Sequence, residues 1–224
     1  GLSFTDVARI TTINAEELFA LKRGDVQARI AYPIRDSLYL NITNRCSNYC
    51  SFCAKFKSYT VKGHYLKLRE ETTAAEVLSS IGPDPLKYDE IVFCGFGEPL
   101  IRLDVVKEVG MTLKKRGCRI RIDTDGLANL VHGRNVLPEL QFVDTISVSL
   151  NAPDSETYQR LIKTPFGDNA YPAILYFLRE AKKHIAKVVA SAVTVPGVDI
   201  EACRRVAQDE IGVAFRARQY DSVG

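Results

Sequence analysis

The chain has 224 residues, of which 46% are hydrophobic and 25% are charged. This composition excludes a disordered or collagen-like chain and predicts one α/β or α+β domain with a substantial core. Lys and Arg number 30 and Asp and Glu 27, and the basic residues are scattered, so no general nucleic-acid-binding surface is predicted, although a nucleic-acid substrate stays open. Neither a signal peptide nor a stretch of about 20 apolar residues is apparent, so we expect a cytoplasmic protein without a membrane partner.

The first 37 residues lack the pattern of the rest of the chain. Apolar residues at helical spacing predict a helix from Phe4 to Phe19. The segment from Ala20 to Ser37 holds Pro33 and six charged residues, which is typical of a linker. We therefore expect residues 1–37 to form an N-terminal helix and linker, and residues 38–224 to form the main domain.

The main domain alternates short β-branched runs with segments of helical periodicity, which predicts a parallel sheet. The pattern fits both an incomplete (β/α) barrel and an open doubly wound sheet, and it does not choose between them. The expected strands are 38–43, 90–94, 119–124, 145–150, 188–195 and 213–220. The expected helices are 73–80, 102–116, 133–140, 154–163 with 170–185, and 199–210.

Three of the six cysteines follow the first predicted strand in the stretch NRCSNYCSFCAKF. Cys46, Cys50 and Cys53 have CxxxCxxC spacing, which lets three thiolates surround one face of a four-iron cluster. A fully protein-bound cluster needs four cysteines, so three leave one iron open to an external chelating ligand. This spacing is the strongest functional signal in the sequence.

Other interpretations of these thiols remain open at this point. A structural zinc site needs a fourth Cys or His, and His64 lies nearby at a spacing that matches no ordinary zinc pattern. A ferredoxin-type site needs a fourth cysteine, and unmetallated thiols so close together would oxidise readily. We expect the other three cysteines to be buried small hydrophobic residues: Cys94, Cys118 and Cys203.

The cysteine motif resembles that of the radical S-adenosylmethionine (SAM) superfamily, CxxxCxΦC, with Phe52 as the aromatic residue. The resemblance extends over residues 38–224 and implies an α/β fold, a partial (β/α)6 TIM-like barrel. It also implies a [4Fe–4S] cluster on Cys46, Cys50 and Cys53, with SAM chelated to the unique iron. Reductive cleavage of SAM would then give a 5′-deoxyadenosyl radical, with electrons from a donor such as flavodoxin or ferredoxin.

Within the superfamily, the stretch from NITNRCSNYCSFC to KGHYLKL looks most like the TatD-linked radical SAM proteins. The N-terminal text GLSFTDVARITTINAEELFAL resembles the C-terminal helix of TatD-like nucleases, although an ordinary amphipathic helix explains it too. The resemblance implies a fused or neighbouring TatD-like nuclease as a partner. It suggests a nucleotide or nucleic-acid substrate by association alone.

The stretch CGFGEPL, after the second predicted strand, resembles the superfamily's GGEP motif, with Phe96 in place of a small residue. Glycines permit close backbone approach, and a carboxylate at the end of a strand can accept a hydrogen bond from an ammonium group. The resemblance assigns Gly95, Gly97 and Glu98 to the methionyl amino group of SAM, with Pro99 shaping the turn. Alone, the stretch is typical of a plain strand-to-helix turn.

Two further strand ends carry polar residues. The third ends in RIDTDG, where Asp123 and Asp125 would face the cofactor, although an Asp-Gly pair is also ordinary turn chemistry. The fourth ends in TISVSLNAP, where Ser149 and Asn151 are candidates for the ribose hydroxyls of SAM by resemblance. The alternative is that these residues only begin a loop.

The last two strands give weaker signals. Val195 and Gly197, in TVPGV, are loose matches to an apolar wall beside adenine. Arg216, Arg218 and Tyr220 share one face of the sixth strand, and we expect Arg218 to point inward, where it could hold a carboxylate or phosphate of SAM or of a substrate.

The sequence thus favours a radical SAM enzyme acting on an unidentified substrate. The alternative is a zinc- or iron–sulfur-containing binding or electron-transfer module that serves a TatD-like nuclease.

Overall fold

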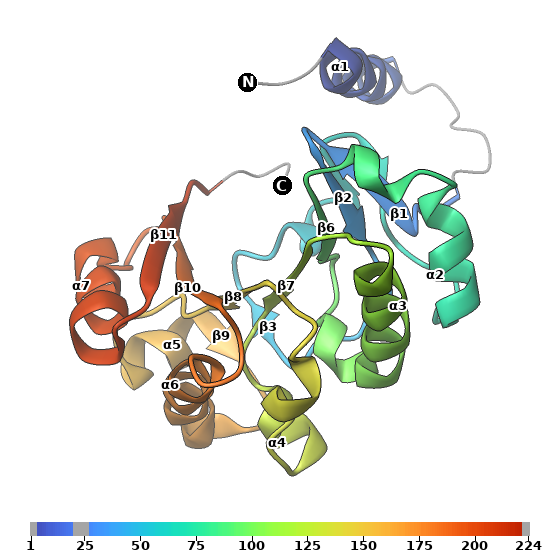
Figure 1. Ribbon diagram of the computed structural model, residues 1–224. Coiled ribbons are helices and arrows are strands. Elements are labelled where there is room, and N and C mark those ends of the chain that lie inside the picture. Colours follow the sequence, from blue (N-terminus) through green and yellow to red (C-terminus); the bar gives the residue numbers. More distant parts are fainter. Residues whose placement is uncertain (1–3, 20–26, 221–224) are drawn as a thin grey trace.

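The structure, a computed structural model, describes residues 4–19 and 27–220. Its centre is a seven-stranded sheet with the order β1-β2-β6-β7-β8-β10-β11 (Figure 1). β1 pairs antiparallel with β2, and every other pairing in this sheet is parallel. The strands are β1 (Ala31–Ile34), β2 (Ser37–Leu40), β6 (Glu90–Phe93), β7 (Ile120–Thr124), β8 (Thr145–Ser149), β10 (Lys187–Val193) and β11 (Ala214–Arg218).

The strand order chooses between the two architectures that the sequence left open. A doubly wound sheet reverses its strand order at a switch point. Here the six parallel strands follow one another in chain order from β2 to β11, and β11 pairs only with β10. The fold is therefore a partial (β/α)6 barrel, as expected, with β1 added at one edge.

Helices surround the sheet on its outer side (Figure 1). Those after the first are α2 (Ala74–Ile81), α3 (Leu103–Lys115), α4 (Ala128–His132), α5 (Ser155–Leu161), α6 (Ala170–Ala181) and α7 (Ile200–Arg205), which continues as a π-helical turn to Ile211. Two short strand pairs lie outside the main sheet: β3 (Tyr49–Cys50) with β9 (Ile162–Lys163), and β4 (Thr60–Val61) with β5 (His64–Tyr65).

The two faces of the sheet differ in character. Residues such as Ile91, Ile122 and Ile146 are fully buried in the core beneath the helices. The alternate positions carry the polar residues. The strand register aligns Tyr39, Val92 and Arg121 in one row, and Asp123 with Ser147 in the next. We call this second surface the inner face, defined by Tyr39, Glu90, Arg121, Asp123, Ser147, Ser149, Ser191, Arg216 and Arg218.

The outer core explains why the longer helices form. α3 buries Val106, Val109 and Leu113, and α6 buries Ile174 and Phe177 at the same three- and four-residue spacing. Each such side chain contributes about 1.5–3 kcal/mol when removed from water. α6 packs on both β8 and β10, so one helix covers two neighbouring parallel strands.

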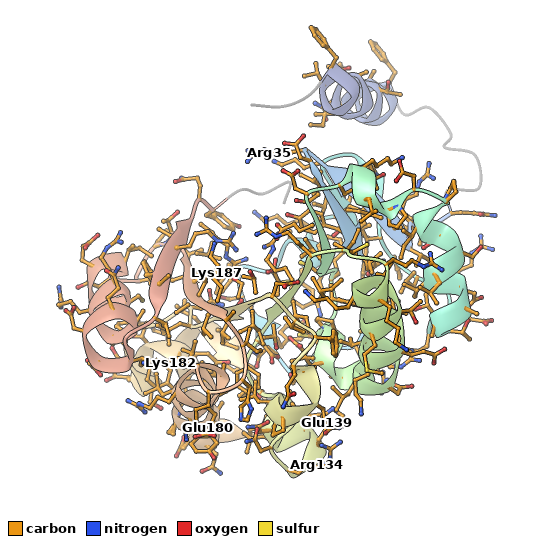
Figure 2. All side chains as sticks on the ribbon, viewed as in Figure 1. Arg35, Arg134, Glu139, Glu180, Lys182 and Lys187 are labelled. Atoms are coloured by element: carbon orange, nitrogen blue, oxygen red, sulfur yellow. The ribbon has the colours of Figure 1, made fainter. Side chains whose placement is uncertain are left out.

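One predicted helix is wrong. The segment expected as a helix from 133 to 140 begins with Gly133, which instead ends α4 in the left-handed conformation, with φ 63°. Leu137–Leu140 then forms only a 3-10 turn. Within this turn, the Glu139 carboxylate pairs with Arg134, as Figure 2 shows, and with Lys107.

The N-terminal helix is present as α1, from Phe4 to Leu18. Its apolar residues Phe4 and Leu18 are 96% and 78% exposed, so this helix is not part of the core. Part of the expected linker is a strand, because Ala31–Ile34 forms β1, where Pro33 is tolerated on an edge strand. No helix within the described ranges is long and apolar enough to cross a membrane.

Two glycines with positive φ, one just after β7 and one at the end of α4, differ in how tightly their surroundings are packed. Gly126 has φ 81°, and a Cβ there would lie 2.8 Å from Cγ1 of the buried Val148, whereas a Cβ on Gly133 would meet nothing within 4 Å. We expect Gly133→Ala to lower the free energy of unfolding by about 1–2 kcal/mol through left-handed strain alone. Gly126→Ala should cost about 1–3 kcal/mol more because of the collision. Urea unfolding measures both, and equal losses would contradict this packing.

Candidate active site

The three cysteines of the motif lie on one loop after β2, which we call the cluster loop (residues 44–53). All three are free thiols of intermediate burial. β3, within the loop, pairs antiparallel with β9, and Ser51 N–H donates to Leu161 O at 2.9 Å. The loop is therefore held against the segment that follows α5, far away in the sequence.

The base of the cluster loop is tied to the GFGEP turn after β6. The Glu98 N–H donates to Arg45 O at 2.7 Å. A Cβ on Gly97 would collide with the carbonyl oxygens of Thr43 and Arg45, so only glycine fits this close approach. A Cβ on Gly95 would likewise collide with the side chain of Asn41. Both glycines thus have a packing role that position in the motif alone did not reveal.

A second set of contacts, which the sequence did not indicate, fixes the start of the loop. Glu71 accepts hydrogen bonds from Thr43 Oγ1 at 2.8 Å, Arg102 Nη1 at 2.8 Å and Arg45 Nη2 at 3.3 Å. Burial alone would raise the pKa of Glu71, but these hydrogen bonds outweigh it and lower the pKa. Glu71 therefore works as an ionised carboxylate that clamps the end of β2.

The far side of the loop is held by two further hydrogen bonds. Ser47 Oγ donates to Asp125 Oδ2, and Asn48 Nδ2 donates to the hydroxyl of the fully buried Tyr158 at 3.0 Å. The Oδ1 of Asn48 is buried without a hydrogen-bond partner among the described residues. The loop is thus connected to the end of β7 and to α5 as well as to β6.

Glu98 and Asp125 form a buried carboxyl pair beside this loop. Glu98 is 3% exposed and accepts hydrogen bonds from Leu100 N, Thr124 Oγ1 and Asp125 N. Burial and the neighbouring Asp125 raise the pKa of Glu98, and burial raises the pKa of Asp125. No salt bridge between described residues involves either carboxyl. An ammonium group would supply the missing cation, so this pair fits the amino group of SAM.

The thiols also lie in surroundings that call for a cation. Burial, followed by Asp125 and Glu98, raises the pKa of Cys46 to about 12. Burial, followed by the thiols of Cys46 and Cys53, raises the pKa of Cys50. Iron is a cation, so its binding would stabilise the thiolate forms that burial and the nearby acidic groups disfavour. Three sulfur donors on one loop therefore fit an iron–sulfur cluster.

The same residues fit a single zinc ion poorly. Within residues 4–19 and 27–220, no group of three or more His, Cys, Asp or Glu side chains converges as the ligands of one metal ion would. A tetrahedral zinc site needs all its ligands around one ion, at about 2.0–2.3 Å. The cysteines of a cubane bind different iron atoms, so their sulfurs do not need to meet at one point.

On the inner face, Asp123 is not free to bind a ligand by itself. Arg121 donates to both of its carboxylate oxygens, at 2.9 and 3.1 Å, and also to Glu90 at 3.1 Å and to the Tyr39 hydroxyl at 3.1 Å. Burial raises the pKa of Asp123, and Arg121 opposes that rise. Asp123 therefore belongs to an ion-pair network around Arg121.

Among the isolated cysteines, the expectation for Cys94 is wrong. Cys118 and Cys203 are buried in the core, as expected. Cys94 is only half-buried. After burial, the charges that act most on its thiol are those of Asp123 and Arg121. The Cys94 thiol therefore borders the polar inner face instead of the core.

The last residues of β8 and β11 meet across the inner face. Arg218 Nη2 donates to Ser149 Oγ at 3.3 Å, so Arg218 points inward as predicted from the sequence. Asn151 is buried with φ 57°, and its Oδ1 accepts from Val193 N at 3.3 Å, which joins the ends of β8 and β10. This contact gives Asn151 a structural role in addition to the predicted one.

The remaining predicted residues lie around the site at varying distance from the thiols. Phe52 is partly buried and packs against the core, and Pro99 is buried at the start of a 3-10 turn capped by Glu98. Val195 is buried, whereas Gly197 lies in an exposed turn whose carbonyl accepts from Arg160 at 3.0 Å. Among the described residues, this hydrogen bond ties Gly197 to α5 and not to the cluster loop.

His64 lies away from the thiols. Its Nε2 is 3.1 Å from Pro33 O, and its ring centroid is 5.3 Å from that of Tyr32. His64 is therefore a buried polar residue that packs and hydrogen-bonds beside β1. Tyr220 N donates to Thr194 Oγ1, and its hydroxyl accepts from Lys57 Nζ, so it packs at the rim of the sheet.

Replacing Cys46, Cys50 or Cys53 with Ala should remove most of the iron and sulfide bound after anaerobic reconstitution, because two thiolates cannot hold the cluster. Cys118→Ala is the matched control, since this thiol lies in the core, and its iron content should equal that of the wild type. Equal iron content in all four variants would exclude the motif as the ligand set.

Replacing Glu71 with Gln should lower stability at pH 7 by about 1 kcal/mol or less, because the carboxylate is partly solvated. A lowered folded-state pKa gives stability that is complete above the unfolded pKa and is lost as the pH falls through the folded pKa. The difference in the free energy of unfolding between Glu71→Gln and wild type should therefore shrink below about pH 4.3, the ordinary Glu pKa. Denaturant unfolding at several pH values measures it, with the exposed Glu70→Gln as control, and a pH-independent difference would contradict the clamp.

The chain is similar to proteins of one superfamily in both sequence and structure. A family model described as "Radical SAM superfamily" matches residues 40–209. Two probable dual-specificity RNA methyltransferases RlmN are each 28% identical: that of Thermus thermophilus over 182 residues (75% of this chain, 47% of the relative) and that of Prochlorococcus marinus over 220 residues (92% and 58%). The chain spans about half the length of these curated relatives.

Solved structures show the same fold. A radical SAM methyltransferase from Sphaerobacter thermophilus has a TM-score of 0.57 at 19% identity, covering 84% of this chain and 57% of that chain. Streptococcus suis SuiB bound to S-adenosylmethionine has a TM-score of 0.56 at 17% identity, covering 82% and 40%. Since the family model covers most of the chain, from the first parallel strand through the cluster loop to α7, the protein belongs to the radical SAM superfamily, whose members use a [4Fe–4S] cluster and SAM.

Proposed function

We propose that this radical SAM enzyme binds its cluster through Cys46, Cys50 and Cys53 and acts on a nucleotide in RNA. The observation that supports the site most strongly is the anchored cluster loop beside the buried pair of Glu98 and Asp125. Three thiols and a carboxyl pair that lacks a cation are complementary to an iron cluster and to the amino group of SAM.

Each group of residues has a separate task in this proposal. When bound and reduced by an external one-electron donor, the cluster would supply the electron that splits SAM into methionine and a 5′-deoxyadenosyl radical. Glu98 holds the methionyl amino group, while the backbone around Gly95 and Gly97 lets the turn approach closely. Ser149 and Asn151 lie at the end of β8 for the ribose. Asp123, within β7, and Asp125, just after it, face the cofactor. Val195 and Gly197 lie after β10 for the adenine.

The RNA substrate is supported by the names of the relatives and by the surface formed by the cluster loop and the 3-10 turn that follows it (Ala54–Phe56). Tyr49 and Phe56 are 61% and 44% exposed, and their ring centroids are 4.2 Å apart. Lys55 Nζ lies 5.3 Å from the centroid of Phe56. Exposed aromatic rings beside a lysine can stack on unpaired bases and attract the phosphate backbone.

Three expectations from the sequence remain part of the proposal. They are the TatD-linked assignment with its nuclease partner, the flavodoxin or ferredoxin donor, and the cytoplasmic location. The relatives described above bear on the superfamily and not on these details.

The anaerobically reconstituted and reduced protein should convert SAM to 5′-deoxyadenosine or methylate an RNA oligonucleotide, measured by liquid chromatography and mass spectrometry. Glu98→Gln should weaken SAM binding by about tenfold or more, because it removes a charge-assisted hydrogen bond, while iron content stays unchanged. The exposed Glu108→Gln on α3 is the control and should match wild type in both measurements.

Two results would count against the proposal. A protein with full iron content that consumes no SAM, with or without RNA, would refute the chemistry. SAM consumption that is accelerated by a peptide but not by RNA oligonucleotides would refute the substrate class while leaving the chemistry intact.

A further inference from the structure

Two arginines of β11 extend over the inner face. Arg216 and Arg218 are two residues apart, so their Cα atoms lie about 7 Å apart on the same side of the strand. Arg216 Nη2 donates to Ser147 Oγ at 3.2 Å, and Arg218 Nη2 donates to Ser149 Oγ at 3.3 Å. Both side chains therefore reach across β10 to β8, with their guanidinium groups held by neutral hydroxyls.

The positive charge of these two side chains is not balanced by an ion pair. Arg121 pairs with both carboxylates of this face, Glu90 and Asp123, so three arginines share two carboxylates and the face keeps one net positive charge. No salt bridge between residues that the structure describes involves Arg216 or Arg218. A guanidinium group stays protonated in proteins, so this excess charge persists at every working pH.

Arg218 also carries a buried hydrogen-bond donor that no described residue satisfies. Its Nε is inaccessible to solvent and has no hydrogen-bond partner in the described part of the chain. Buried donors are almost always paired, and an uncompensated buried cation is costly. The Nε and the free charge together indicate a ligand that is both a hydrogen-bond acceptor and an anion.

The location suits a substrate that must meet the cofactor. Arg218 is the last residue of β11, at the carboxyl edge of the sheet, where active sites of this architecture lie. Its guanidinium contacts Ser149 at the end of β8, on the inner face. Arg216 is exposed, so the pair is open to solvent on one side.

We propose that Arg216 and Arg218 form an oxyanion-binding subsite that holds a phosphate of the nucleotide substrate. Carboxylate and phosphate share the required chemistry, and two guanidinium groups match the charge and the several oxygens of a phosphate better than a single carboxylate. The nature of the substrate rests on the proposed function, whereas the location of the subsite rests on the two side chains themselves.

The test measures binding of inorganic phosphate and, separately, of SAM to the reconstituted protein by calorimetry. Arg218→Gln and Arg216→Gln should each weaken phosphate binding by about tenfold or more. The phosphate affinity of Arg218→Lys should lie between that of the Gln variants and that of wild type, because lysine keeps the charge but loses the planar guanidinium group. Arg204→Gln is the matched control, since Arg204 contacts Phe215 on the opposite face of β11, and its phosphate affinity should be unchanged.

The outcomes separate this subsite from the proposed function. Unchanged phosphate affinity in Arg216→Gln and Arg218→Gln, in protein with normal circular dichroism and iron content, would overturn the subsite. If the variants lose SAM affinity but still bind phosphate, the proposed phosphate ligand is refuted and the arginine pair is assigned to the carboxylate of SAM. Arginine-dependent phosphate binding in a protein that cleaves no SAM would support the subsite and refute only the proposed chemistry. Because Arg216 is exposed, its variant provides a result even if Arg218→Gln fails to fold.

Discussion

The site depends on how the cluster loop is fastened to the carboxyl edge of the sheet. A loop of this kind buries little apolar surface, so ordering it costs conformational entropy that hydrophobic packing does not offset. Hydrogen bonds provide the compensation, among them Glu98 N–H to Arg45 O, Ser47 to Asp125, and Asn48 to Tyr158. Each contributes only about 0.5–1.5 kcal/mol. Together they connect the loop to the turns after β6 and β7 and to helix α5, so these three elements fix the positions of the thiols.

The two faces of the sheet lie in different environments, an apolar core on the outer side and a polar surface on the inner side. Its outer face supplies the stability, through apolar residues under the helices. Its inner face carries charges that would be costly there without partners. Arg121 resolves most of this cost by pairing with Glu90 and Asp123 and by donating to Tyr39. The network fixes the charges on β6 and β7, while the arginines of β11 make no ion pair among the described residues, so the cations without an ion pair lie on one side of the inner face.

Much of the fold follows from local patterns, and the site follows from them only in part. The parallel strands and most helices were predictable because apolar periodicity and local caps, such as Asp154 before α5, act within a few residues. β1 was missed because Pro33 suggests a loop and the strand forms only through its pairing with β2. The cysteine spacing identified the loop, but not its anchors. Ser47, Asn48 and Thr43 find their partners 78, 110 and 28 positions away, and no local pattern encodes such contacts.

The distribution of charge along the carboxyl edge also has a chemical consequence. Over β6 and β7, the edge presents Glu98 and Asp125 without a cation, and at β11 it presents Arg218 without an anion. Electrostatic interactions strengthen where water is excluded, so each end would attract a ligand group of the opposite sign. A cationic group of the cofactor and an anionic group of the substrate would then approach from opposite sides of Ser149. Two partners that must react would thus be oriented by preplaced polar groups before any chemistry begins, which lowers the entropic cost of bringing them together.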